Sequence, residues 1–199
     1  TISPIQSSYK YQPFNTFEQT EKDVIEKEET FRLSNFSLGT WFRIDRIDHN
    51  GPVILLNKGG FGGERPGENL NFGIWLNPSE TIEGGFETKP GTNVFVSSQG
   101  KYNDGLWHYV LLTYDNKILK LYIDGVLADS KITSGVTPDN SGDQDFVIGG
   151  NSFMDDKFFK GDLDEIRVWN RALNTEEVSN GFNNNTFNTN GQIFYEPYS

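Results

Sequence analysis

Three glutamates near the middle of the chain come closest to the residue types and spacing of hydrolytic chemistry. A pair of carboxylates can cleave a glycosidic bond when one acts as nucleophile or base and the other donates a proton. Glu80, Glu83 and Glu87 follow one another at intervals of three and four residues. Along a β-strand Glu83 and Glu87 would share one face but lie about 13 Å apart, given the rise per residue. Because hydrolases hold their carboxylates closer together, a glycoside hydrolase is a remote alternative.

Histidine chemistry is restricted to His49 and His108, the two imidazoles of the chain. This number limits catalytic triads and histidine-based zinc sites, and the glycine spacings of nucleophile elbows and nucleotide-binding loops are absent. A polysaccharide lyase would need His and Tyr beside Arg and Gln, with His108 as its strand candidate. We therefore predict no catalytic residue and expect a binding protein rather than an enzyme.

A second set of side chains has the composition of a sugar-binding site. An exposed aromatic plane stacks on the apolar face of a pyranose, while guanidinium and amide groups bond its hydroxyls. Three aromatics and two polar residues fit these roles: Trp75, Phe61, Phe153, Arg65 and Asn69. The glycine-rich segment 59–69 would let a loop reach over a groove. The alternative for each aromatic is packing in the core or over a sheet edge, as most aromatics of β-sandwiches do.

Short strands must position these residues, because apolar and polar residues alternate with period two along much of the chain. Asp124-Gly125 separates two such runs and is a strong signal for a tight hairpin turn. The expected strands cover residues 11–17, 23–26, 31–33, 36–44, 53–57, 70–77, 81–86, 93–97, 106–114, 118–123, 158–169 and 192–195, with a short partner strand after the hairpin turn.

The strand at 70–77 decides how Trp75 is presented. Alternation would turn Leu70, Phe72, Ile74 and Leu76 toward the interior and leave Trp75 on the opposite surface. One helix is expected, with Asn174 as its N-cap and Glu177 as the reciprocal partner of a capping box. Residues 180–190 are rich in turn formers and predict an irregular passage before a C-terminal edge strand.

Composition excludes several classes of protein. The net charge is −11, from 17 basic and 28 acidic residues; such a surface repels phosphate backbones and anionic lipids, so we expect neither nucleic-acid binding nor membrane insertion. Cysteine is absent, which removes disulfides and thiolate metal sites. No apolar run approaches the ~20 residues of a membrane-spanning helix. The length of 199 residues suits one β-sandwich domain over residues 1–199.

The second half of the chain carries three matching segments: Asp104-Gly-Leu-Trp107-His108, Leu121-Tyr-Ile-Asp124-Gly125, and the run from Phe159 to Leu173 that contains Leu163-Asp-Glu-Ile-Arg-Val-Trp169. Their order resembles the laminin-G-like branch of the concanavalin A-like lectin/glucanase superfamily. The resemblance implies an all-β fold, a two-sheet antiparallel β-sandwich jelly roll with one short helix near the C-terminus. It points only loosely to function, because this architecture hosts lectins, lyases, glucanases and adhesion modules.

The resemblance also implies a metal site. Asp164 matches the position at which relatives place a carboxylate that binds a structural calcium ion. Calcium takes six to eight oxygens, so the remaining ligands would come from Glu21, Asp23 and carbonyl groups near Gln12. The alternative is that Asp164 and its neighbour Glu165 pair with Arg167 or Arg171, or cap backbone amides.

The expected function is that of a non-catalytic, lectin-like recognition module for a polysaccharide or glycan, located outside the cell or on its surface and carrying structural calcium. The main alternative is a structural or adhesive module that contacts a cell-surface protein and has no sugar site. A polysaccharide lyase or glycoside hydrolase is the remoter alternative.

Overall fold

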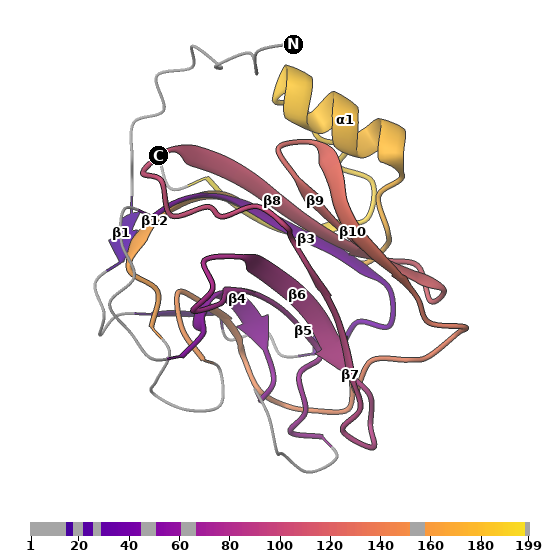
Figure 1. Cartoon of the computed structure of the whole chain (residues 1–199). Helices are drawn as coiled ribbons and strands as arrows, with labels where there is room; N and C mark the ends of the chain where they lie inside the picture. Colours follow the sequence, from indigo (N-terminus) through magenta and orange to yellow (C-terminus); the bar gives the residue numbers. More distant parts are fainter. Residues whose placement is uncertain are drawn as a thin grey trace.

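The computed structural model describes residues 15–17, 22–25, 29–44, 51–60, 67–151 and 158–197, with residues 15–17 described by backbone alone. Phe61, Arg65, Phe153 and Glu21, four of the predicted site residues, lie outside these ranges. Two layers of antiparallel strands face each other, and one helix lies outside one of them (Figure 1). The predicted jelly-roll sandwich is thereby confirmed.

The first layer is a seven-stranded sheet within the described residues. Its order is β1-β12-β3-β8-β9-β10, and β13 pairs with the same strand, β12, that pairs with β1. The bounds are β1 Asn15–Phe17, β12 Gly161–Trp169, β3 Phe36–Arg43, β8 Trp107–Tyr114, β9 Ile118–Ile123, β10 Val126–Ile132 and β13 Gln192–Glu196.

The second layer is a six-stranded sheet with the order β2-β11-β4-β5-β6-β7. Its strands are β2 Asp23–Ile25, β11 Phe146–Ile148, β4 Val53–Lys58, β5 Phe72–Leu76, β6 Ile82–Glu87 and β7 Asn93–Ser97. Neighbouring strands are antiparallel in both sheets. Residues far apart in sequence therefore meet across each sheet.

The main core lies between the two sheets and is rich in aromatic rings. Phe86 and Tyr114 face each other from opposite sheets with ring centroids 4.6 Å apart, and Phe36 lies within 5.9 Å of Tyr114. Aromatic pairs of this kind stabilise a core by about 0.5–1.5 kcal/mol beyond the area they bury. The strands alternate as predicted, because Phe72, Ile74 and Leu76 all enter this core.

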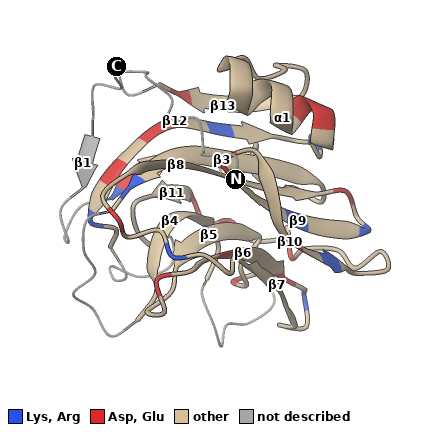
Figure 2. Cartoon of the chain, turned by 45° about the horizontal axis from the view of Figure 1, so that its top comes forward, with Lys and Arg blue, Asp and Glu red and all other residues tan. Residues whose placement is uncertain are grey.

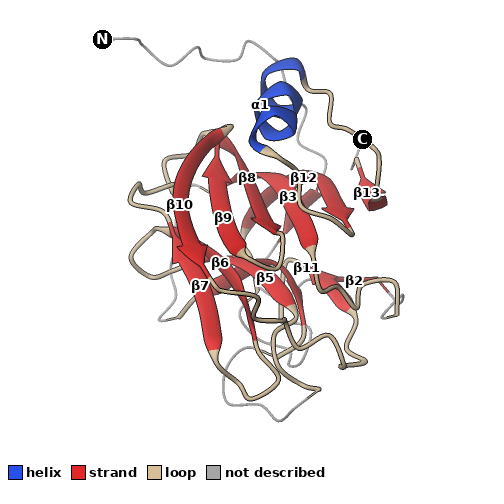
Figure 3. Ribbon diagram, turned by 90° about the vertical axis from the view of Figure 1, so that its right-hand side faces the viewer, coloured by secondary structure: helices blue, strands red, loops and turns tan. Residues whose placement is uncertain are grey.

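A second apolar cluster covers the outer face of the seven-stranded sheet. Helix α1, Thr175–Asn184, lies over this face on the side away from the six-stranded sheet (Figure 3). The buried members of the cluster are Tyr109, Leu111, Tyr122, Trp169, Leu173, Val178 and Phe187. The capping box is confirmed, since the side chain of Asn174 accepts from the Glu177 amide and the Glu177 carboxylate accepts from the Asn174 amide.

Three elements of the structure differ from the sequence predictions. The helix continues to Asn184, through residues expected to be irregular, because Val178 and Gly181 bury its inner face. Phe31 to Leu33 form a turn and an irregular segment rather than a strand, and the short strand β11 was missed. The hairpin turn is confirmed: Asp124 and Gly125 have φ of 52° and 75°, which suits the predicted tight turn.

Within the described ranges, no helix is long and apolar enough to cross a membrane.

Candidate functional site

Trp75 is buried, so the prediction that it offers an exposed stacking plane is wrong. It is 1% exposed on the outer face of the six-stranded sheet. Its ring packs edge-on against Phe95 at 4.9 Å and contacts a small apolar cluster with Ile54 and Leu70. Leu70 was expected in the main core, but it precedes β5 and packs on the outer face instead. These apolar neighbours make Trp75 a structural residue in the described chain.

The glutamates of β6 are held by neighbouring donors. Trp75 Nε1 and Asn77 Nδ2 both donate to one carboxylate oxygen of Glu83, at 3.0 and 2.8 Å. Glu87 is 3% exposed and accepts from the Leu70 amide at 3.0 Å. Both glutamates lie on the outer face, four residues apart along one strand. Their different partners and this spacing give no support to a paired catalytic site.

Asn69, the predicted amide donor for a sugar, is instead 3% exposed and engaged with protein groups. Its Nδ2 donates to Asp139 Oδ2 at 2.8 Å and to the Lys89 carbonyl at 3.2 Å. The same carboxylate accepts from the Gly67 amide and from the Ser141 hydroxyl. Burial raises the pKa of Asp139, but these hydrogen bonds outweigh burial and hold its pKa below the ordinary value. The network fixes the loops that border β5 and β6.

Asp164 lies in β12 with 2% of its surface exposed. Burial is the main cause that raises its pKa to about 6; the amide of Glu165 lowers it and the charge of Glu165 raises it further. Its Oδ1 accepts from that amide at 2.7 Å, where β12 bulges and Glu165 adopts φ of 52°. A buried carboxylate with so few donors requires a proton or a cation to balance it.

The other predicted metal ligands are not gathered around Asp164 in the described residues. Asp23 belongs to β2, which pairs with β11 in the opposite sheet. Among the described side chains, no group of three or more His, Asp and Glu could hold a metal ion. Glu165 pairs with Arg167, as the alternative reading anticipated, whereas Arg171 pairs with Glu177 at 2.6 Å. Asp164 itself takes part in neither ion pair.

His108, near the start of β8, interacts with two aspartates through its two ring nitrogens. Its Nδ1 lies 2.8 Å from Asp124 Oδ2, and its Nε2 lies 3.2 Å from Asp104 Oδ1. Burial lowers the pKa of His108, but the hydrogen bonds and negative charges of the two aspartates outweigh burial and raise its pKa above the ordinary value. Both ring nitrogens are engaged, so His108 fastens the hairpin turn at Asp124.

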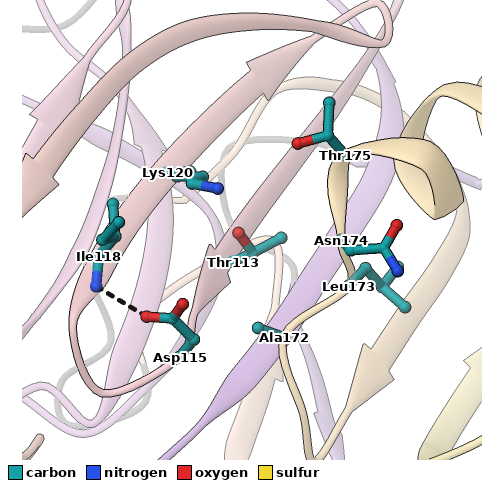
Figure 4. Close-up of a pocket in the computed structure, with 8 residues that line it drawn as sticks. All are labelled: Thr113, Asp115, Ile118, Lys120, Ala172, Leu173, Asn174 and Thr175. Atoms are coloured by element: carbon teal, nitrogen blue, oxygen red, sulfur yellow. Dashed lines mark hydrogen bonds between the residues drawn. The ribbon is translucent and has the colours of Figure 1, made fainter.

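A pocket of about 250 Å³ opens on the outer face of the seven-stranded sheet, beside the start of α1. Figure 4 shows its walls: β8 and β9 on one side and the segment leading into the helix on the other. The lining residues are Thr113, Asp115, Ile118, Lys120, Ala172, Leu173, Asn174 and Thr175. The sequence predictions missed this pocket, because its two walls are more than fifty residues apart in the chain.

The polar groups in this pocket keep unused hydrogen-bonding capacity. Asn174 uses its Oδ1 to cap the helix, and its amide nitrogen makes no hydrogen bond to the residues that the structure describes. Asp115 Oδ1 accepts from the Lys117 and Ile118 amides at 2.9 and 2.7 Å. The Thr113 hydroxyl and the Lys120 ammonium form no hydrogen bond to the described residues. One signal was available in the sequence: in strands 107–114 and 118–123, the outward positions 113 and 120 are polar where 109, 111 and 122 are apolar.

Comparisons with solved structures place this chain among β-sandwiches of several functions. A protein from Bacteroides ovatus ATCC 8483, to which carbohydrate binding is ascribed, has a TM-score of 0.66 and 17% identity over 92% of this chain and 50% of that one. The NanB sialidase from Streptococcus pneumoniae has a TM-score of 0.64 and 18% identity over 84% of this chain and 27% of that one. The binding domain of botulinum neurotoxin serotype G has a TM-score of 0.60 and 14% identity over 77% of this chain and 37% of that one.

This chain therefore spans half or less of the length of these three proteins, and identities this low establish the fold alone. The comparison with curated protein sequences finds no match. A family model does match, over residues 19–179, and its span covers every strand of both sheets except β1 and β13, together with the start of the helix. The chain belongs to the concanavalin A-like lectin/glucanases superfamily.

Proposed function

We propose that this chain is a non-catalytic carbohydrate-recognition module. The carbohydrate binding ascribed to the Bacteroides ovatus protein agrees with this function at the level of the fold. The observation that carries the proposal is the pocket beside α1, where hydroxyl, amide, carboxylate and ammonium groups converge with unused hydrogen bonds. Small-ligand sites combine such polar groups with an apolar wall, which Ile118 supplies here. The pocket is small enough to select one sugar unit rather than a long chain segment.

The role of this pocket can be tested with one hydroxyl. Thr113→Val removes the hydroxyl but keeps the shape of the side chain, so binding on a broad glycan array should fall by about tenfold, the value of one buried hydrogen bond. Thr137→Val is the matched control, because Thr137 is exposed in a loop away from the pocket lining. Silence of the wild-type chain across neutral and acidic glycans would reject the proposed function.

We also propose that Asp164 helps to hold a structural calcium ion. Its burial and raised pKa support this, since a cation would balance the ionised carboxylate. The expected further ligands, Glu21 and the carbonyl groups near Gln12, lie outside the described residues. A chelator should lower the melting temperature of the wild type and leave Asp164→Asn unaffected, with exposed Asp143→Asn as the control. No shift of the wild type on chelation would reject the metal site.

The adhesive alternative has one observation in its favour. Edge strand β10 exposes Val126, Leu127 and Ile132 by 68%, 48% and 78%, and exposed apolar side chains grouped on one element can mark a protein-binding surface. Replacing Ile132 with Ser would weaken such a protein contact and leave glycan binding intact.

We further propose that the module works outside the cell or on its surface; recovery of the native protein in the cytosol would contradict this location.

A further inference from the structure

The pocket beside α1 contains a lysine whose charge is not balanced by any residue in the described ranges. Lys120 is partly buried in the middle of β9, and its ammonium forms no ion pair or hydrogen bond with the described residues. In Figure 4 the ammonium end of Lys120 points over Thr113, into the space between β9 and Asn174. A partly desolvated cation gains more from an anionic partner than an exposed one does, because the local dielectric is lower.

The surroundings of Lys120 are locally basic although the chain is acidic overall. Lys117 and Lys131 lie at the same end of the β9–β10 hairpin, and neither forms an ion pair with a described residue. Basic segments on β9 and β10 are visible in Figure 2, whereas acidic residues mark the start of α1. In a chain with a net charge of −11, three lysines at one hairpin end that have no ion pair among the described residues make the local potential less negative for an anion that approaches Lys120.

Asp115 and Lys120 give the two sides of the pocket opposite charges. Asp115 lines the wall opposite Asn174 and does not pair with Lys120, and two backbone amides already compensate one of its oxygens. A carboxylate on this side accepts hydrogen bonds from sugar hydroxyls and repels an anion. A ligand with hydroxyls at one end and a negative group at the other would therefore settle with its negative group at Lys120.

We propose that the pocket binds an acidic sugar, whose carboxylate or sulfate pairs with Lys120 while its ring hydroxyls bond to Asp115, Thr113 and Asn174. This inference rests on the proposed carbohydrate-binding function and specifies the ligand class of the same site. Charge-assisted hydrogen bonds are roughly twice as strong as neutral ones. Lys120 thereby becomes the residue that separates acidic from neutral sugars, and Ile118 packs against the apolar face of the ring.

The test compares glucose, glucuronate and glucose 6-sulfate as ligands of the whole chain, titrated by NMR at low salt. Glucuronate or glucose 6-sulfate should bind about tenfold more tightly than glucose, and the difference between the two identifies which anion the pocket prefers. Lys120→Met removes the charge and keeps the apolar stem, so it should abolish this preference, and glucuronate and glucose 6-sulfate should then bind no more tightly than glucose. Lys120→Arg retains the charge and should retain the preference.

Lys131→Met is the matched control, because the register places Lys131 opposite Leu119 of the inner core and hence on the other face of the sheet from Lys120. An equal loss in Lys131→Met and Lys120→Met would overturn the inference, since it would indicate a general charge effect. Equal affinity of the wild type for all three sugars would also overturn the acidic-sugar inference and leave the proposed function standing. The absence of binding to any glycan on the array would overturn the proposed function itself.

Discussion

The outer faces of the two sheets carry similar types of residue, but these residues have different roles on each face. On the six-stranded sheet, Trp75, Glu83 and Asn69 are the aromatic, acidic and amide groups expected of a sugar site, yet each is bonded or packed against neighbouring protein groups. On the seven-stranded sheet, Thr113 and Lys120 line an open pocket and make no hydrogen bonds to the described residues.

This difference shows that residue type alone does not identify a binding surface. A polar group that is already satisfied inside the protein gains little from a ligand, because binding must first break an existing hydrogen bond. A group with unused capacity exchanges only a hydrogen bond to water and can keep a net gain of about 0.5–1.5 kcal/mol. The contrast predicts that substitutions on the six-stranded face reduce stability, whereas substitutions in the pocket reduce binding.

Trp75→Ala is the largest test of this contrast. Removing a buried tryptophan leaves a cavity beside Phe95, Leu70 and Ile54 and frees a Glu83 carboxylate oxygen from one donor. The free energy of unfolding should fall by about 3–5 kcal/mol, which chemical denaturation would measure. A variant as stable as the wild type would contradict the structural role, and would return Trp75 to the list of ligand-binding candidates.

Asp139→Asn should have the next largest effect. The carboxylate accepts from Asn69, Gly67 and Ser141, and the neutral amide cannot accept at both ends of its side chain. We expect unfolding to become easier by about 1–3 kcal/mol at pH 7. Because the pKa of Asp139 lies below its ordinary value, the difference between wild type and variant should shrink as the pH falls below 4. A difference that stays constant from pH 7 to pH 3 would contradict this account.

Much of the fold could be predicted from the sequence because local patterns agree with it. The strands at 93–97 and 118–123, the hairpin turn and the capping box were all placed correctly. These features depend on alternation, turn residues and caps within a few residues of one another. Phe146 to Ile148 of β11 form a short apolar run without alternation, so local patterns do not predict a strand there. Pairing with β4 and β2 decides the structure of this segment.

The candidate site was harder to predict for a physical reason. Alternation placed Trp75 on the outer face correctly, but what covers an outer face depends on segments distant in sequence, here Phe95 and Leu70. The pocket likewise forms where residues 172–175 pass over β8 and β9. Neither arrangement can be predicted from the alternation of apolar and polar residues along a single strand.

Asn174 allows stability and binding to be separated within the pocket. Asn174→Ala removes the N-cap and should cost about 1 kcal/mol, whereas Asn174→Asp keeps an equally good cap. The aspartate adds a negative charge to the pocket lining, so thermal unfolding should change little while the affinity for glucuronate falls. Unchanged glucuronate binding in Asn174→Asp would indicate that the ligand lies elsewhere, and the contrast between the two faces would lose its functional meaning.

The smallest expected effect is the pH dependence of stability that arises from His108, near the start of β8 and at the opposite end of that strand from the pocket. Since Asp124 and Asp104 raise the pKa of His108 above its usual value of 6.5, the folded state holds the proton more tightly than the unfolded state. The resulting stability is complete below pH 6.5 and disappears as the pH rises through the raised pKa. The unfolding free energy of the wild type should therefore fall more between pH 5.5 and pH 8.5 than that of His108→Gln. Asp104→Asn, which removes one of the two charges, should give an intermediate slope. Parallel curves for all three proteins would indicate that the two aspartates hold a neutral imidazole.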